Sequence, residues 1–137
     1  MTSSVVYNSD LRTTCTHLNS GNSIETDAPR DNHGKGERFS PTDLLATSLS
    51  SCMLTVMGIK ASGMGLKLDG IETTVNKIMK ADPRRVGGIE INFSFPPALQ
   101  NLSEKEREIL KNTAETCPVL KSLHPDIEIV VDWSSWG

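Results

Sequence analysis

Aromatic residues and positive charge are both scarce in this chain of 137 residues. Phe, Trp and Tyr make up 4% of it, the formal net charge is −3, and the pI is about 5.6. Proteins that bind nucleic acid or an anionic membrane need a basic surface, and base stacking needs aromatic side chains. The composition therefore argues against a nucleic-acid partner and against a membrane-surface partner.

The sequence also lacks the signals of export and of membrane insertion. Its first residues, Met-Thr-Ser-Ser-Val-Val-Tyr, contain no basic segment followed by a long apolar one, so no signal peptide is predicted. No apolar run approaches the roughly 20 residues that a membrane-spanning helix requires. We therefore expect no membrane partner and a cytoplasmic location.

Cysteine is sparse, with three residues in the chain: Cys15, Cys52 and Cys117. An odd number without a Cys-x-x-Cys pair does not make a disulfide framework, and in a reducing compartment a disulfide would be transient and chemical. Cys15 and His17 have no second ligand pair at short spacing, so no metal site is predicted. We expect Cys15 to be a packing residue or a neutral surface thiol.

Two common enzyme motifs are missing. Gly34-Lys35-Gly36 lacks the frame and the following Ser or Thr of a phosphate-binding loop. The serines of Ser48–Ser51 do not lie in a Gly-x-Ser-x-Gly elbow. The sequence therefore predicts neither a nucleotide cofactor nor a serine hydrolase.

The most strongly signalled element is one long helix, from Ser40 to about Gly63. Ser40 can cap it, Pro41 suits its first position, and Asp43 stands three residues after the cap. Its apolar residues recur at helical spacing and extend beyond one stripe: Leu45, Leu49, Cys52, Val56, Met53, Met57 and Ile59. A helix that is apolar around so much of its girth is expected at the centre of the fold.

The remaining pattern predicts strands and two shorter helices around this central helix. The expected strands are residues 4–7, Leu11–His17, Ser23–Thr26, Lys67–Ala81, Ile89–Phe95 and Ile127–Trp133; the loop before the central helix is Asp27–Phe39; and the shorter helices are Ser103 to about Glu115 and Thr116–Leu123. This order predicts a single α+β domain over residues 1–137 with mostly antiparallel strands.

Cys52 and Cys117 are the candidate reactive residues. A cysteine in mid-helix is most often a small buried hydrophobe, but hydroxyl groups within one turn of Cys52 can hydrogen-bond a thiolate or line a polar pocket; they belong to Thr47, Ser48, Ser50, Ser51 and Thr55. Cys117 precedes Pro118 at a helix start, where the helix dipole favours a thiolate and lowers the thiol pKa. The alternative for Cys117 is a partly buried capping residue without chemistry.

Together, Cys52 and Cys117 indicate a dithiol pair in which one sulfur attacks and the other resolves the oxidised product. The two cysteines are 65 positions apart, so the sequence does not show whether they meet.

Two stretches resemble the OsmC/Ohr family of thiol-dependent peroxidases. The stretch "FSPTDLLATSLSSCM" is similar to the family's Asn/Ser-Pro-x-Glu/Asp-Leu helix, which ends in a small residue and a cysteine. The stretch "TCPVLKSL" is similar to the family's Cys-Pro motif near the C-terminus, and "TDAP" resembles the start of a glycine-containing loop in one branch. The predicted order of elements agrees with the family over essentially the whole chain.

The resemblance implies an OsmC-like fold assembled as an intertwined homodimer, with an active site at each subunit interface. It implies that Cys52 attacks the peroxide and that Cys117 resolves the product as an intramolecular disulfide. The implied substrates are organic hydroperoxides or hydrogen peroxide, and the implied reductant is a dithiol such as a lipoylated protein. No metal, haem or flavin cofactor is implied.

The sequence departs from the family at the charge partners of the attacking cysteine. Active members pair the thiolate with an arginine and with a glutamate ten residues before the cysteine, where this chain has Thr42. Arg12 and Arg38 are the candidate arginines. The alternative function is a non-catalytic small-molecule-binding or stress-related structural dimer, in which Cys52 belongs to the core and Cys117 is only a cap.

Overall fold

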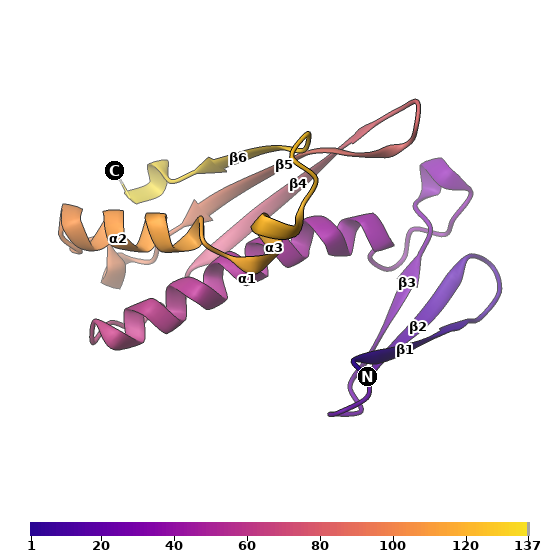
Figure 1. Cartoon of the computed structure of the whole chain (residues 1–137), viewed down its shortest axis with the longest axis horizontal. Coiled ribbons are helices and arrows are strands. Elements are labelled where there is room, and N and C mark those ends of the chain that lie inside the picture. Colours follow the sequence, from indigo (N-terminus) through magenta and orange to yellow (C-terminus); the bar gives the residue numbers. More distant parts are fainter. Residues whose placement is uncertain (137) are drawn as a thin grey trace. The chain divides into compact units, whose positions relative to one another are not determined.

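The computed structural model describes residues 1–136 and divides the chain into two compact units, Met1–Leu45 and Ala46–Gly137. The boundary falls within the first long helix, α1 (Pro41–Gly63). Figure 1 labels the helices and strands of both units. A single domain over the whole chain stays a prediction.

The first unit is built on a three-stranded antiparallel sheet. Its strands are β1 (Ser3–Tyr7), β2 (Arg12–His17) and β3 (Ser23–Asp27), in the order β1-β2-β3, and a 3₁₀ turn, Arg30–Asn32, follows them. Cys15 pairs with Val5 on one side and with Ile24 on the other. The three strands predicted near the N-terminus are therefore confirmed, and they form an antiparallel meander.

One face of this N-terminal sheet is apolar and exposed. Because alternate residues of a strand share a face, Val5 and Tyr7 lie on the same face as Cys15 and Ile24. Val5 and Tyr7 are 61% and 64% exposed, and Ile24 is exposed as well. Among residues 1–45, all described by the structure, the buried side chains are the polar Thr26, Asp27 and Ser40. The first unit thus buries no hydrophobic side chain of its own.

Helix α1 begins as the sequence predicts. Ser40 Oγ accepts the backbone N–H of Asp43 at 3.0 Å, and the Asp43 carboxylate accepts the backbone N–H of Ser40 at 2.9 Å. This reciprocal pair satisfies two donors at the start of the helix. The helix has 23 residues, and its buried side chains are Ala46, Leu49, Ser50, Met53, Met57 and Ala61.

By length and composition, α1 passes the test for a helix able to cross a membrane. The sequence still has no unbroken apolar run of this length, because short hydroxyl-bearing residues interrupt the apolar residues of α1 without making the helix polar. A core helix passes the same test, and α1 supplies buried side chains to the core of the second unit. Ile59, in contrast, is 71% exposed.

The second unit is an α+β arrangement around a second three-stranded sheet. Its elements are β4 (Glu72–Lys80), β5 (Arg85–Ser94), α2 (Glu104–Ala114), α3 (Pro118–Ser122) and β6 (Glu128–Asp132), with short 3₁₀ turns at Pro97–Leu99 and Ser134–Trp136. The α+β fold class is confirmed, and a capping box between Ser103 and Glu106 starts α2. Strand β6 pairs with β5 in parallel, not antiparallel, because α2 and α3 form a crossover between them.

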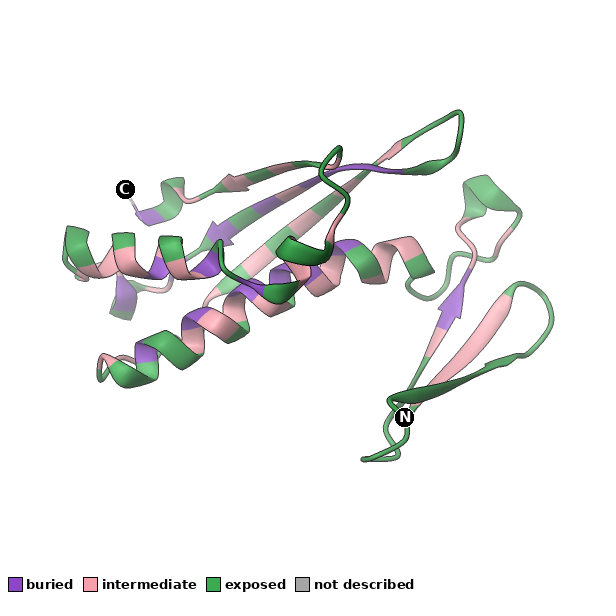
Figure 2. Cartoon of the chain, viewed as in Figure 1, coloured by how far each residue is buried: buried purple, intermediate pink, exposed green. Residues whose placement is uncertain are grey.

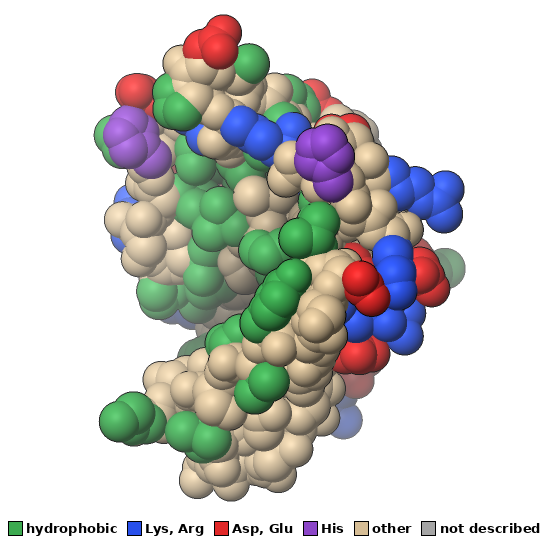
Figure 3. Space-filling model, turned by 90° about the vertical axis from the view of Figure 1, so that its right-hand side faces the viewer, with side chains coloured by type: hydrophobic (Ala, Val, Ile, Leu, Met, Phe, Trp, Pro, Cys, Tyr) green, Lys and Arg blue, Asp and Glu red, His purple; other side chains and the backbone are tan. Residues whose placement is uncertain are grey.

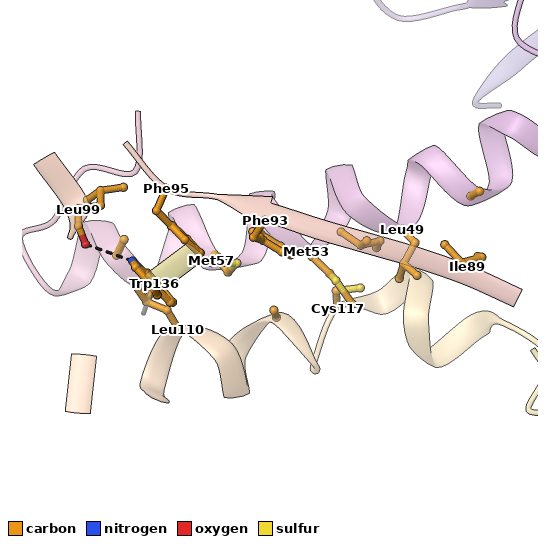
Figure 4. Close-up of a cluster of buried hydrophobic side chains, with 14 of the residues drawn as sticks. Leu49, Met53, Met57, Ile89, Phe93, Phe95, Leu99, Leu110, Cys117 and Trp136 are labelled. Atoms are coloured by element: carbon orange, nitrogen blue, oxygen red, sulfur yellow. Dashed lines mark hydrogen bonds between the residues drawn. The ribbon is translucent and has the colours of Figure 1, made fainter. Parts of the chain in front are cut away.

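Strand β5 lies at the centre of this sheet, between β4 and β6, and faces α1 with its apolar side. Ile89, Ile91 and Phe93 are buried in alternation with more exposed polar residues (Figure 2). Figure 4 shows Ile89 and Phe93 together with side chains of α1, Leu110 of α2 and Trp136. Cys117 belongs to the same buried cluster.

Candidate functional site

Cys52 lies on α1, next to the fully buried side chains of that helix. Its neighbours Leu49 and Met53 are fully buried, while Cys52 itself is half-buried and packs against the core cluster. Because α1 buries one continuous face over most of its length, the backbone at Cys52 is fixed by packing. The thiol therefore combines a rigid position with partial access to solvent.

Cys117 is placed by the junction between α2 and α3. Its backbone is extended, with φ −62° and ψ 138°, as an N-cap residue requires, and Pro118 occupies the first position of α3. The Cys117 Sγ accepts the backbone N–H of Leu120 at 3.3 Å. The predicted N-cap position is thus confirmed, and the residue is 0% exposed.

The fold brings the two cysteines together. The side chains of Cys117 and Cys52 lie close enough for Cys52 to raise the pKa of the Cys117 thiol, although 65 positions separate the two residues in the sequence. Both are free thiols in this structure. The dithiol hypothesis needs this juxtaposition, and the spacing in the sequence did not reveal it.

Cys117 does not have the low pKa that its position at a helix start predicts. Burial raises the pKa of the Cys117 thiol above its ordinary 9.0, and the hydrogen bond and charge of Cys52 raise it further. Hydrogen bonds from the N–H groups of Leu120 and Val119 lower the pKa of Cys117, but by less than burial raises it. The expectation of a thiolate at Cys117 was wrong, because α3 has only five residues and the sulfur is excluded from water.

The hydroxyl groups expected around Cys52 are found mostly elsewhere on α1. Thr47, Ser50, Ser51 and Thr55 line an open groove of about 430 Å³ between α1 and β4, with Leu54, Thr73 and Val75 as its other lining residues. Ser50 and Thr73 are hydrogen-bonded across it at 2.6 Å. Cys52 does not line this groove, because successive helical residues are turned by about 100° and the hydroxyls follow a different face.

Both candidate arginines bind carboxylates within the first unit. Arg12 donates to Asp27 through Nε and Nη2, at 2.7 and 2.9 Å. The Nε atom of Arg38 lies 3.3 Å from Oε1 of Glu25. Cys52 and Cys117 belong to the second unit, so a role for either arginine beside Cys52 stays a prediction. Sequence reasoning missed Asp27 as a partner of Arg12; its place in the "TDAP" stretch was the available signal.

Within the described residues 1–136, no group of three or more His, Cys, Asp and Glu side chains could hold a metal ion. The first turn of α1 also lacks a glutamate: Thr42 lies within hydrogen-bonding distance of Ser40, at 3.2 Å between the hydroxyl oxygens. The adjacent Asp43 carboxylate is used in the helix cap.

The family model described as OsmC-like protein matches residues 34–132, which include both cysteines. The chain belongs to the OsmC family. No curated protein matches the OsmC-family chain by sequence.

Solved structures agree with this family assignment. A Psychrobacter arcticus 273-4 protein, named provisionally for osmotic stress induction and detoxification response, is 56% identical, with a TM-score of 0.91 over 96% of this chain and 94% of its own. The organic hydroperoxide resistance protein OsmC of Legionella pneumophila is 16% identical, with a TM-score of 0.72 over 95% and 93% of the two chains.

The organic hydroperoxide resistance protein OhrB of Bacillus subtilis is 17% identical, with a TM-score of 0.62 over 96% of this chain and 97% of its own. At such low identity, the last two likenesses establish a shared OsmC-like fold.

Proposed function

We propose that this OsmC-family protein is a dithiol peroxidase that reduces organic hydroperoxides or hydrogen peroxide, with Cys52 attacking and Cys117 resolving. The observation that carries the proposal is the close approach of the two cysteine side chains within the buried cluster. Two structural relatives that are named for hydroperoxide resistance support the choice of substrate.

The assignment of the two roles follows from access and ionisation. Cys52 is half-buried, so a peroxide has a route to it, whereas Cys117 is fully buried. The thiolate is the nucleophile toward peroxides, and burial keeps Cys117 protonated by raising its pKa. Cys52 is therefore the attacking sulfur, and Cys117 waits beside it as a neutral thiol.

The reaction balances in three steps. The Cys52 thiolate attacks one peroxide oxygen, the O–O bond breaks, and the leaving alkoxide or hydroxide takes a proton, which leaves a sulfenic acid on Cys52. The Cys117 thiol then attacks that sulfur, the S–O bond breaks, and water leaves with the thiol proton. An external dithiol, for which a lipoylated protein is our candidate, reduces the disulfide by thiol–disulfide exchange.

The same proposal includes an intertwined homodimer in the cytoplasm. In the first unit, the apolar face carrying Val5, Tyr7 and Ile24 is exposed, and hydrophobic side chains reach the surface in the view of Figure 3. In the second unit, β4 is an edge strand of its sheet and Ile59 of α1 is exposed. A small sheet is stable only when its apolar face is covered, and a second copy of the chain supplies such surfaces.

The second candidate function is a non-catalytic small-molecule-binding or stress-related structural dimer. Thr42 replaces the glutamate of active family members, and the guanidinium of Arg12 is bound to Asp27. In this alternative the two cysteines are packing residues only, and the open groove between α1 and β4 receives the ligand.

Counting thiols separates the two candidates. The reduced protein is treated with one equivalent of cumene hydroperoxide or hydrogen peroxide, and its mass is measured. The protein is then unfolded, its remaining thiols are alkylated, and the mass is measured again. For a dithiol peroxidase, the mass falls by two hydrogens, only Cys15 is alkylated, and dithiothreitol restores all three thiols. If all three cysteines remain alkylatable at their original rates, the peroxidase proposal is wrong.

A further inference from the structure

Helix α3 is held by few interactions. It has five residues, and none of these, all described by the structure, is fully buried; Val119 and Leu120 are only half-buried. A helix this short does not persist without outside contacts. The N–H of Leu120 is satisfied by the sulfur of Cys117, and the Lys121 N–H donates to the Cys117 carbonyl at 3.2 Å. The start of α3 therefore depends on the position of one residue.

The Cys117 sulfur has two partners in the reduced protein. It accepts the Leu120 N–H, and it also lies close enough to the Cys52 side chain for Cys52 to raise its pKa. A disulfide would replace the second contact by a covalent bond, which draws the two sulfurs well inside van der Waals contact. The Cys117 sulfur then has to move away from the Leu120 N–H, or Cys52 has to move toward Cys117.

The two sides of this contact are anchored very differently. Cys52 is carried by α1, which buries Leu49 and Met53 on either side of it and Met57 one turn further on. In α3 no side chain is anchored to that extent. When the sulfurs are drawn together, the displacement therefore falls on Cys117 and on the helix that its sulfur caps.

We propose that formation of the Cys52–Cys117 disulfide removes the sulfur cap from α3 and locally unfolds residues 118–122, which exposes the Cys117 sulfur of the disulfide to the dithiol reductant. This inference rests on the proposed function. Cys117 is 0% exposed in the reduced form, so a reductant cannot reach its sulfur while α3 is folded as seen here. Reduction returns two thiols, and the cap on Leu120 then forms again.

Hydrogen exchange of individual amides tests this coupling. The disulfide is made in one sample with peroxide and in another with diamide, a general thiol oxidant, and is confirmed by the loss of two hydrogens. In both, the amides of Leu120, Lys121 and Leu123 are expected to exchange roughly tenfold faster than in the reduced protein, as the loss of a helix cap implies. Amides in the middle of α2 serve as the internal control and keep their protection.

Two substitutions of Cys117 provide a matched comparison without any disulfide. Cys117→Ser keeps an acceptor for the Leu120 N–H, so its α3 amides should exchange as slowly as in the reduced wild type. Cys117→Ala removes the acceptor and should show the fast exchange of the oxidised protein. If Cys117→Ala fails to fold, the oxidised and reduced wild type still decide the question.

The outcomes separate this inference from the proposed function. A disulfide with unchanged exchange in α3, or a Cys117→Ala protein as protected as Cys117→Ser, would overturn the coupling. So would a failure of diamide to join Cys52 and Cys117. If diamide forms the bond and speeds exchange in α3 but peroxide does neither, the peroxidase proposal fails and the coupling stands.

Discussion

Arg12 and Asp27 form a two-point ion pair that ties β2 to β3: Nε and Nη2 of the arginine donate to the two carboxylate oxygens at 2.7 and 2.9 Å. The backbone N–H of Glu37 donates to the same carboxylate at 3.1 Å. Asp27, only 1% exposed, therefore also fixes the segment that leads into α1. The guanidinium charge of Arg12 is therefore already paired with the Asp27 carboxylate.

Asp27→Asn should lower the unfolding temperature by a few degrees at neutral pH, with Asp69→Asn, at an exposed position, as the matched control. The Arg12 hydrogen bond and the Glu37 N–H lower the pKa of Asp27 from 3.8 to about 2. Because the folded-state pKa is the lower one, the stabilisation is complete above about pH 4 and is lost as pH falls toward 2. The difference from wild type, followed by circular dichroism, should therefore shrink over that window; a constant difference would contradict the assignment.

Cys117→Ser should separate attack from resolution. Without the resolving thiol, the sulfenic acid on Cys52 has no local partner and persists or oxidises further. We expect this variant to consume about one equivalent of peroxide and to gain one or two oxygens in mass. Cys52→Ser should consume almost none. Equal reaction of the two variants would remove the division of roles between Cys52 and Cys117.

Cys15→Ser should leave peroxide consumption essentially unchanged. Cys15 lies on β2, between Val5 and Ile24, and belongs to the first unit. Initial rates of peroxide loss with an external dithiol present measure the effect. A loss as complete as that of Cys52→Ser would show that the catalytic pair has been assigned wrongly.

Val5→Glu should weaken the dimer, because it places a charge on the apolar face of the N-terminal sheet. Ser4→Glu is the matched control, since its side chain is on the opposite face of the same strand. Sedimentation at micromolar concentration should show a dimer for the wild type and for Ser4→Glu, and a smaller or unfolded species for Val5→Glu. A compact wild-type monomer would contradict the assembly.

The local parts of this fold follow from the sequence alone. Ser40 with Asp43, and Ser103 with Glu106, are three residues apart, so each cap forms from neighbours within one turn and can be recognised without the rest of the chain. The alternation of β5 and the cap position of Cys117 depend on equally local patterns. The stretch that leads to Cys52 and the Cys117-Pro118 stretch also pointed to the family, and the family model matches residues 34–132.

The chemistry of the site depends on contacts that cross the sequence. The meeting of Cys52 with Cys117 is decided by packing of α1 against the segment after α2, and burial, a property of the whole core, reverses the pKa shift that a helix start predicts for Cys117. Likewise, Arg12 and Asp27 become partners only through the register of β2 and β3. Hydrogen bonding and desolvation act over a few ångströms in space, so long-range pairings become visible only once tertiary structure has brought distant residues together.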